Sequence, residues 1–438
     1  MALNQRPPDL RELETTGLIR RIYDQPDVEF QFRHSLVHEA AYSMLTRVQR
    51  KELHQRVGET LEALYPDRLD EMADLLARHF AVAGRAGEAV QYARRAARRA
   101  ASTHAYDEAS DHLEGALELI RAGGPTPLRR SLQEELGDLY KLCRLGGKAI
   151  AAFQAALADW ESDPEPAPQA LLGLHRKILQ TVADLKWAVD EEEFLAARQI
   201  GQNSRLRLKE GLQGAVGARP NLETARHLAV LSVDAWRTLV PPDWEAARRY
   251  AEEACEIAER IADPVEISAA LGALSQAYVG QGLLREHLQA ARRRLEITED
   301  PDFEDLRERV DSLREVGLAH LTLGDYTGAL PYLDRARELA AKISAVDQQF
   351  NALALQAQCW LRLDRWDDVL AVEERWRELA RGYTREQTGP TCFAVALSAC
   401  VRALRGEREL AESLRRESVD IMVAVSGPDT AWDRNQHY

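Results

Sequence analysis

The alternation of apolar and polar positions changes its period once, close to the start of the chain. Residues 28–32 (Val-Glu-Phe-Gln-Phe) alternate apolar and polar side chains, which is the two-residue period of a half-buried strand. Residues 10–23 predict a short helix that runs into another strand, and Gln25–Val28 supplies turn residues between the strands. We therefore expect a helix and a β-hairpin over residues 1–34, the last part of a winged-helix unit with its wing.

From Ser35 onward the chain has the periodicity of helices. A first helix here predicts a buried stripe of Leu36, Ala40 and Leu45, with Met44 nearby. A second helix ends before a proline at position 66. These two helices form a predicted linking pair over residues 35–66.

Beyond the linking pair, small and large side chains recur in pairs of helices. One copy has Gly137 and Tyr140, then a glycine-containing turn, then Ala149 and Phe153. This is the spacing of the tetratricopeptide repeat. The small residues allow two antiparallel helices to approach closely, and the large ones fill the remaining space. The pattern predicts an all-α fold, a tetratricopeptide-repeat superhelix that follows the small hairpin remnant.

The later copies recur with a period of about forty residues. Equivalent positions fall at 247, 287, 329, 369 and 410, in steps of 40, 42, 40 and 41. Residues 165–225 fit least well, and we expect the glycine-rich stretch 208–221 to be a loop. The predicted segments are a partial winged helix (1–34), the linking pair (35–66), a first array (67–164), a divergent repeat and loop (165–225), a second array (226–425) and a tail (426–438).

Composition and charge narrow the possible functions. Hydrophobic residues make up 45% of the 438 residues, and the formal charge is −14. An acidic chain repels nucleic acid and anionic membranes on average. The five cysteines form no CxxC pair, so we expect reduced thiols and a cytoplasmic location. No signal peptide is recognisable, and no apolar stretch is long enough to span a membrane.

The sequence contains few candidate catalytic or metal-binding residues. His34 and His38 are spaced like two zinc ligands on a helix, and His54 is the nearest third candidate. Packing is the preferred interpretation, because no second ligand follows His38 at helical spacing. The sequence has no GxSxG motif and no Cys-His signature. We expect no catalytic residue, no metal ligand and no cofactor.

The stretch from Phe30 to His54, with the repeats after it, resembles one region of a known family. It is similar to the winged-helix and tetratricopeptide-repeat region that follows the ATPase module in bacterial STAND-class signalling ATPases, among them LuxR-type ATP-binding regulators and cyclase-linked ATPases. The resemblance covers residues 10–120 most specifically. The matching residues are Phe30, Phe32, His34, His38, Glu39, Tyr42, Arg50, Leu53 and His54.

The ATPase motif of that family is missing from this sequence. A Walker A loop needs GxxxxGK followed by Ser or Thr, and the nearest string, 145–150, lacks the first glycine and the hydroxyl residue. The resemblance therefore implies a non-catalytic sensor or scaffold module of a bacterial signal-transduction or transcription regulator, which transmits to an ATPase module in a longer relative. The alternative is a DNA-associated transcription regulator that acts through the winged-helix portion.

The partner we expect is a protein or peptide. The family's pattern of groove positions gives amides and arginines in the later repeats, where amides can bind a peptide backbone and arginines can bind carboxylates. We therefore predict a groove for an acidic or C-terminal peptide. The candidate groove residues are Gln276, Arg314, Asn351, Gln358, Arg362 and Arg402.

Overall fold

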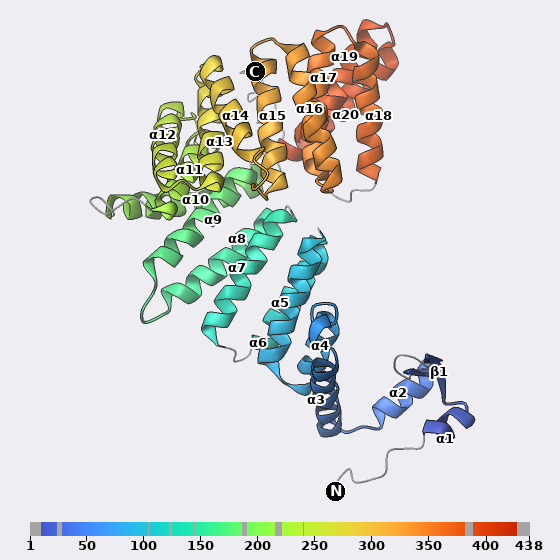
Figure 1. The fold of residues 1–438 in the computed structure, drawn as a ribbon. Helices are drawn as coiled ribbons and strands as arrows, with labels where there is room; N and C mark the ends of the chain where they lie inside the picture. The colour runs from blue at the N-terminus through green and yellow to red at the C-terminus, as the bar shows by residue number, and fades with distance from the viewer. Residues whose placement is uncertain are drawn as a thin grey trace. The chain divides into compact units, whose positions relative to one another are not determined.

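The computed structural model describes residues 10–23, 29–103, 105–121, 125–143, 145–185, 191–214, 221–239, 241–381 and 389–426. Within these ranges the chain forms twenty α-helices, one short 3-10 helix and one two-stranded sheet (Figure 1). The helices follow one another as antiparallel pairs. The chain divides into two compact units, Met1–Gly124 and Pro125–Tyr438, which are described separately.

The first unit begins with the predicted helix and hairpin. Helix α1 (Leu10–Thr15) leads through Gly17, at φ +75°, into β1 (Ile19–Tyr23), which pairs antiparallel with β2 (Glu29–Phe32). The sequence prediction of a small hairpin at this end of the chain is confirmed. The unit continues with α2 (Ser35–Ser43), α3 (Arg47–Leu64), η1 (Pro66–Arg68), α4 (Ala73–Ala83), α5 (Ala86–Ser102) and α6 (Tyr106–Ile120).

The predicted buried stripe on α2 is wrong. Leu36 is 74% exposed and Met44 is 85% exposed, and α2 has no buried residue. The core of this unit lies further along the chain instead. There Phe80 of α4 stacks on Tyr92 of α5, with ring centroids 5.7 Å apart, and Gly58 of α3 gives the Phe80 ring room. A one-helix amphipathic pattern predicts which face is apolar, but it cannot predict whether another element covers that face.

The second unit is built from fourteen of the described helices. They are α7 (Thr126–Leu142), α8 (Gly146–Glu161), α9 (Pro168–Leu185), α10 (Glu191–Gly214), α11 (Leu222–Arg237), α12 (Trp244–Ile261), α13 (Pro264–Gly280), α14 (Leu284–Thr298), α15 (Leu306–Thr322), α16 (Tyr326–Lys342), α17 (Val346–Arg362), α18 (Trp366–Arg381), α19 (Gly389–Leu404) and α20 (Arg408–Ser426). Helix α10 continues to Gly214, so the expectation that the glycine-rich stretch 208–221 is a loop is wrong for its first half. Leu208 of that stretch is fully buried.

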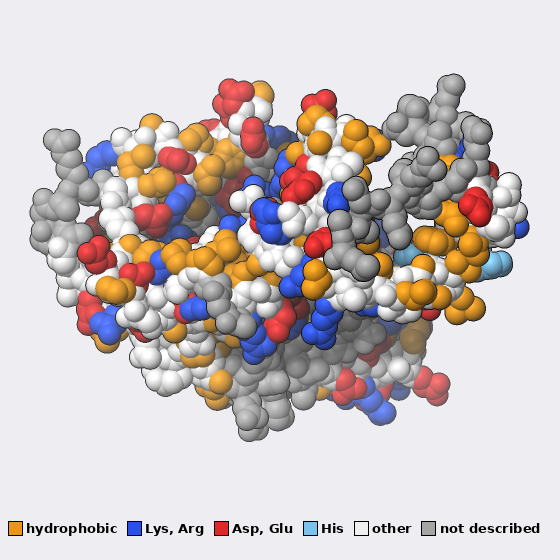
Figure 2. All heavy atoms as spheres, turned by 90° about the horizontal axis from the view of Figure 1, so that it is seen from below, with side chains coloured by type: hydrophobic (Ala, Val, Ile, Leu, Met, Phe, Trp, Pro, Cys, Tyr) orange, Lys and Arg blue, Asp and Glu red, His pale blue; other side chains and the backbone are white. Residues whose placement is uncertain are grey.

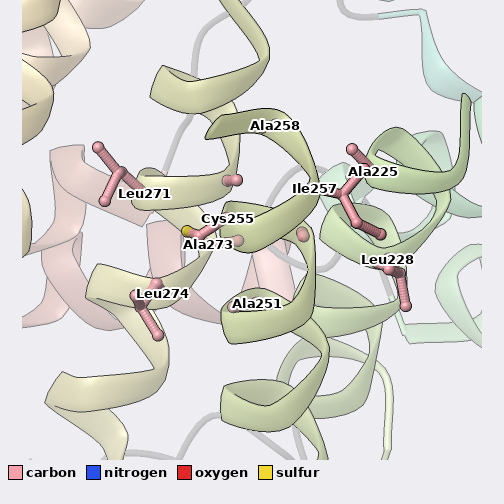
Figure 3. Close-up of a cluster of buried hydrophobic side chains, with 11 residues drawn as sticks. Ala225, Leu228, Ala251, Cys255, Ile257, Ala258, Leu271, Ala273 and Leu274 are labelled. Atoms are coloured by element: carbon pink, nitrogen blue, oxygen red, sulfur yellow. The ribbon is translucent and has the colours of Figure 1, made fainter. Parts of the chain in front are cut away.

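Small residues set the distance within each helix pair, as predicted from the repeat pattern. A methyl group on Gly137 of α7 would come within 2.3 Å of the Phe153 ring of α8, and one on Gly317 of α15 would come within 2.5 Å of Leu333 of α16. Alanines serve the same purpose elsewhere. Figure 3 shows Ala251, Cys255 and Ala258 of α12 between the leucines of α13 and Ala225 and Leu228 of α11.

Polar side chains join each pair to the next with the same forty-residue period. Each of these contacts spans forty residues and joins one helix pair to the following pair, so polar contacts accompany the apolar core along the later part of the array. The pairs are Arg226 with Glu266 (2.7 Å), Ser268 with Glu308 (2.5 Å), Arg307 with Asp347 (2.7 Å) and Arg377 with Glu417 (2.9 Å).

Candidate functional site

The first helices of the last four pairs, α13, α15, α17 and α19, carry equivalent positions on one face. Each of these helices is followed by a residue in the left-handed region, namely Gly282, Gly324, Asp364 and Gly406, with φ between +56° and +84°. On each helix we count backward from this left-handed residue. The positions thirteen, ten, six and two residues before it lie three or four residues apart, so their side chains share one helix face. We call this set of positions the shared face.

The shared face is charged where α15 contributes to it, and a buried ionic cluster lies next to it. Arg294 of α14 has a side chain only 5% exposed, and its guanidinium contacts three carboxylates of α15. The nitrogen–oxygen distances are 2.7 Å to Glu308, 3.1 Å to Asp311 and 3.1 Å to Glu315. Arg314 pairs with Asp311 on the same helix at 2.6 Å.

Electrostatics stabilises the charged forms in this cluster. Burial lowers the pKa of Arg294, but attraction to Glu308, Asp311 and Glu315 outweighs burial and raises the pKa above its ordinary value. Burial also opposes the charged form of Asp311 and on its own raises the pKa of this carboxyl. The two guanidiniums outweigh burial and hold the pKa of Asp311 well below its usual range. Three carboxylates face two guanidiniums, so the cluster is internally satisfied except for one negative charge.

A histidine extends this polar cluster into the core. His287 of α14 is fully buried, and its Nδ1 lies 2.7 Å from the hydroxyl of Ser275, which donates to Glu315 at 3.1 Å. Burial lowers the pKa of His287. We interpret this group as a structural network, because its members lie in the interior of the helix stack.

The α17 part of the shared face is polar, and unlike the α15 part its polar side chains are not paired with other described residues. Asn351, Gln358 and Arg362 lie along one side of this helix, with the two amides half-buried and the guanidinium exposed. Among the described residues, none of the three has a hydrogen-bonding or ion-pair partner. Their donors and acceptors are thus available to another molecule.

The α19 part of the shared face is apolar. Phe393, Ala396, Cys400 and Leu404 occupy it, and all four are exposed. Their equivalents on α17 are Asn351, Ala354, Gln358 and Arg362. The shared face therefore changes from charged on α15, through polar on α17, to apolar on α19.

The six predicted groove residues lie on α13, α15, α17 and α19, and the site they were proposed to form remains a prediction. Five occupy the shared face, whereas Arg402 lies beside it and pairs with Glu407 at 2.6 Å. Gln276 donates to Glu315, and Arg314 is held by Asp311. Those three side chains already have partners within the chain. Sequence reasoning missed the exposed residues of α19, which the forty-residue register could have located.

The residues that carry the family resemblance form a continuous chain of ring contacts in the first unit. His38 lies 5.3 Å from the Phe32 ring and stacks on Tyr42. The Tyr42 hydroxyl is 3.0 Å from Nε2 of His54, whose Nδ1 is 3.0 Å from Nδ1 of His79 on α4. This chain links β2, α2, α3 and α4, so packing explains the spacing of these histidines.

Metal binding and membrane insertion have no structural support in the described ranges. No group of three or more His, Cys, Asp or Glu side chains is placed there to hold a metal ion. In the same residues no helix has the length and apolarity needed to cross a membrane.

Two arginine-rich segments, residues 94–99 and 291–296, are mostly paired within the described chain. Arg95 contacts Asp70 at 2.7 Å, and Arg99 donates to the Glu71 carbonyl at 2.9 Å. Arg294 of the second segment is buried. On the face drawn in Figure 2, basic and acidic side chains are interspersed among apolar ones.

Comparison with known proteins identifies the class of fold. A Signal Transduction ATPase with Numerous Domains (STAND) protein with a tetratricopeptide repeat sensor, from Pyrococcus horikoshii, aligns with 94% of this chain at 14% identity and a TM-score of 0.49. This chain spans 58% of that protein. Rap protein complexed with Competence and Sporulation Factor aligns over 85% of this chain and 98% of its own length, at 11% identity and a TM-score of 0.50.

A third similar structure is NprR in complex with its cognate peptide NprX, which aligns over 85% of this chain and 98% of its own at 14% identity and a TM-score of 0.47. No family model and no curated protein matches the sequence. At these identities the likeness concerns the fold alone. The fold is an all-α tetratricopeptide-repeat array with a small two-stranded sheet near its N-terminus, as predicted.

Proposed function

We infer that the second unit is a non-catalytic interaction module that binds an extended peptide or protein segment along the shared face. The observation that carries this proposal is the row formed by Asn351, Gln358 and Arg362 on α17. Polar side chains that lack partners within the described chain can bind a peptide backbone through the amides and a carboxylate through the guanidinium. The peptide-bound state of NprR, a protein of similar fold, supports a peptide as the ligand.

A finer role follows from the sequence resemblance of residues 10–120. The module would act as the sensor or scaffold part of a bacterial signal-transduction or transcription regulator, and in a longer relative it would pass the bound state to an ATPase module. The DNA-binding alternative has less support, because the arginine-rich segments are engaged with acidic residues and backbone carbonyls. A gel shift at two salt concentrations distinguishes the alternatives, since phosphate contacts weaken steeply with salt.

The peptide proposal is tested with peptides selected on the wild-type protein from a random display library. Fluorescence polarisation then gives the Kd of the best peptides for wild type, Arg362→Ala and the double variant Asn351→Ala/Gln358→Ala. We expect each change to weaken binding about tenfold or more, the equivalent of about 1.4 kcal/mol. The matched control is Arg375→Ala, which removes an exposed arginine from α18, the second helix of the same pair.

Equal affinity of the selected peptides for all four proteins would contradict the proposal. Failure to select any peptide with a Kd below about 100 μM would also contradict it, because specific peptide grooves bind more tightly than that.

A further inference from the structure

In the later part of the second unit, the first helix of each pair packs against the first helix of the following pair. Helix α13 contacts α15, α15 contacts α17, and α17 contacts α19. These contacts reach the shared face, because Gln276 of α13 donates to Glu315 of α15. Ala354, on the shared face of α17, is only 5% exposed. The following pair thus covers part of the shared face of each helix.

Helix α19 belongs to the last described pair, and its shared face is uncovered among the described residues. Ala396 is the equivalent of Ala354 and is exposed. Phe393 is 47% exposed, Leu404 is 59% exposed, and Cys400 is exposed between them. We call these four α19 residues the α19 stripe. The end of a repeat array is normally polar, so an apolar end face indicates association with another molecule.

The α19 stripe has a symmetric order of side-chain sizes. Its large residues, Phe393 and Leu404, lie at the two ends, about 16 Å apart along the helix, and its small residues, Ala396 and Cys400, lie in the middle. Small residues in the middle allow two helices to approach closely, as Gly137 does within its helix pair. A second α19 that runs antiparallel brings Phe393 of one copy beside Leu404 of the other, and Ala396 beside Cys400. The stripe is therefore complementary to itself about a two-fold axis.

We propose that two copies of this chain associate through their α19 stripes, around a two-fold axis that passes between Ala396 and Cys400. The contact continues the packing of the array, with the second copy in the place of a following pair. Charge does not oppose it at the centre, because the sixteen residues of α19 include one charged side chain, Arg402, which is paired with Glu407 at 2.6 Å. This dimer needs no partner peptide, so the inference goes beyond the proposed function.

The strength of the dimer should depend on salt in a characteristic direction. One helix face is small for a protein interface, so we expect a reversible dimer with a Kd of roughly 10 μM. Each copy has a formal charge of −14, so two copies repel one another at low salt. Salt screens this repulsion and leaves the apolar contact intact, so the dimer should become tighter between about 50 mM and 500 mM sodium chloride. A dimer that weakens over this range would be held by ion pairs, which would overturn the proposal.

Sedimentation equilibrium of the full chain tests the surface itself. Leu404→Lys places a charge in the stripe and should weaken the dimer about tenfold or more. The matched control is Leu206→Lys, which changes a leucine of α10 that is 56% exposed and should leave the Kd unchanged. Arg362→Ala should also leave it unchanged, which separates this contact from the peptide groove. Equal Kd values for wild type and Leu404→Lys, or a wild type that stays monomeric up to about 200 μM, would overturn the proposal.

Disulfide formation tests the antiparallel arrangement. Two chains that both carry Cys392→Ser are mixed, one with Cys400 intact and the other with Ala396→Cys and Cys400→Ser. The remaining cysteines are buried, namely Cys143, Cys255 and Cys359. The oxidant diamide should link the two chains to one another, because positions 396 and 400 face each other across the axis. A mixture that forms no linked dimer would overturn the proposal. Protection of Cys400 from N-ethylmaleimide in a monomer would also overturn it, because the same chain would then cover the stripe.

Discussion

Arg294 and Glu315 form an ion pair in the interior of the second unit, with Nη1 3.1 Å from Oε2 and side chains only 5% and 2% exposed. The two residues come from consecutive helix pairs, on α14 and α15. Such a pair contributes little net stability relative to apolar residues of the same shape, but removal of one partner leaves a buried charge without compensation.

Arg294→Met should therefore destabilise the protein by about 3–5 kcal/mol, because three carboxylates of α15 lose their shared cation. Urea unfolding followed by circular dichroism measures the change. The control is Arg293→Met, whose side chain is 55% exposed and pairs at the surface. Arg293→Met should lower the free energy of unfolding by about 1 kcal/mol or less. Equal costs for the two variants would show that the cluster is not desolvated.

The destabilisation by Arg294→Met should depend on pH. The pKa of Asp311 in the folded protein is depressed, so its contribution is complete above the unfolded value of about 3.9 and is lost as the pH falls toward the folded value. Without Arg294 this depression is smaller. The difference in free energy of unfolding between wild type and variant should become smaller by about 1 kcal/mol as the pH falls from 5 to 3. A difference that stays constant would contradict this assignment.

Gly137→Ala should destabilise the second unit by about 1–3 kcal/mol, because the new methyl group overlaps the buried Phe153 ring. Gly173 of α9 is the matched control, since a methyl group there has no neighbour within 4 Å. Gly173→Ala should stabilise by about 0.5–1 kcal/mol through the reduced backbone entropy of the unfolded chain. Thermal unfolding of both variants tests the pair, and opposite signs are the expected result.

Two buried histidines of the second unit should make stability fall in mild acid. Burial lowers the pKa of both His175 and His227 to about 4, with nearby arginines adding to the effect. The unfolded chain therefore binds more protons than the folded chain between pH 6.5 and about pH 4, and stability decreases as the pH falls through that window. His227→Gln should flatten the decrease measured by urea unfolding. An unchanged slope in His227→Gln would contradict this assignment.

The sequence was informative wherever packing is decided within one helix pair. The spacing of Gly137 and Phe153 predicted their contact, since the helix period and a short turn together determine which side chains meet. The hairpin from β1 to β2 was predicted for the same reason, because its pairing depends only on neighbouring residues.

The prediction was poorest where the contacts come from another element. Arg294 stands in a run of arginines that has the appearance of a solvated face, and it is buried because Glu308, Asp311 and Glu315 of the next pair surround its guanidinium. The spacing of those acids, three and four residues apart on one face of α15, was the available signal. The prediction for Leu36 was wrong in the opposite sense, because this residue was expected to be buried and is exposed. It belongs to an apolar helix stripe, but no described element covers that stripe.

The polar contacts between residues forty positions apart have a mechanical consequence. Arg226–Glu266, Arg307–Asp347 and Arg377–Glu417 each join one hairpin to the hairpin that follows it, and the helix contacts of the second unit's described residues likewise run between neighbouring hairpins. A pulling force applied through the end of α20 should therefore unfold the array one hairpin at a time. Single-molecule stretching should record these steps as a sawtooth trace.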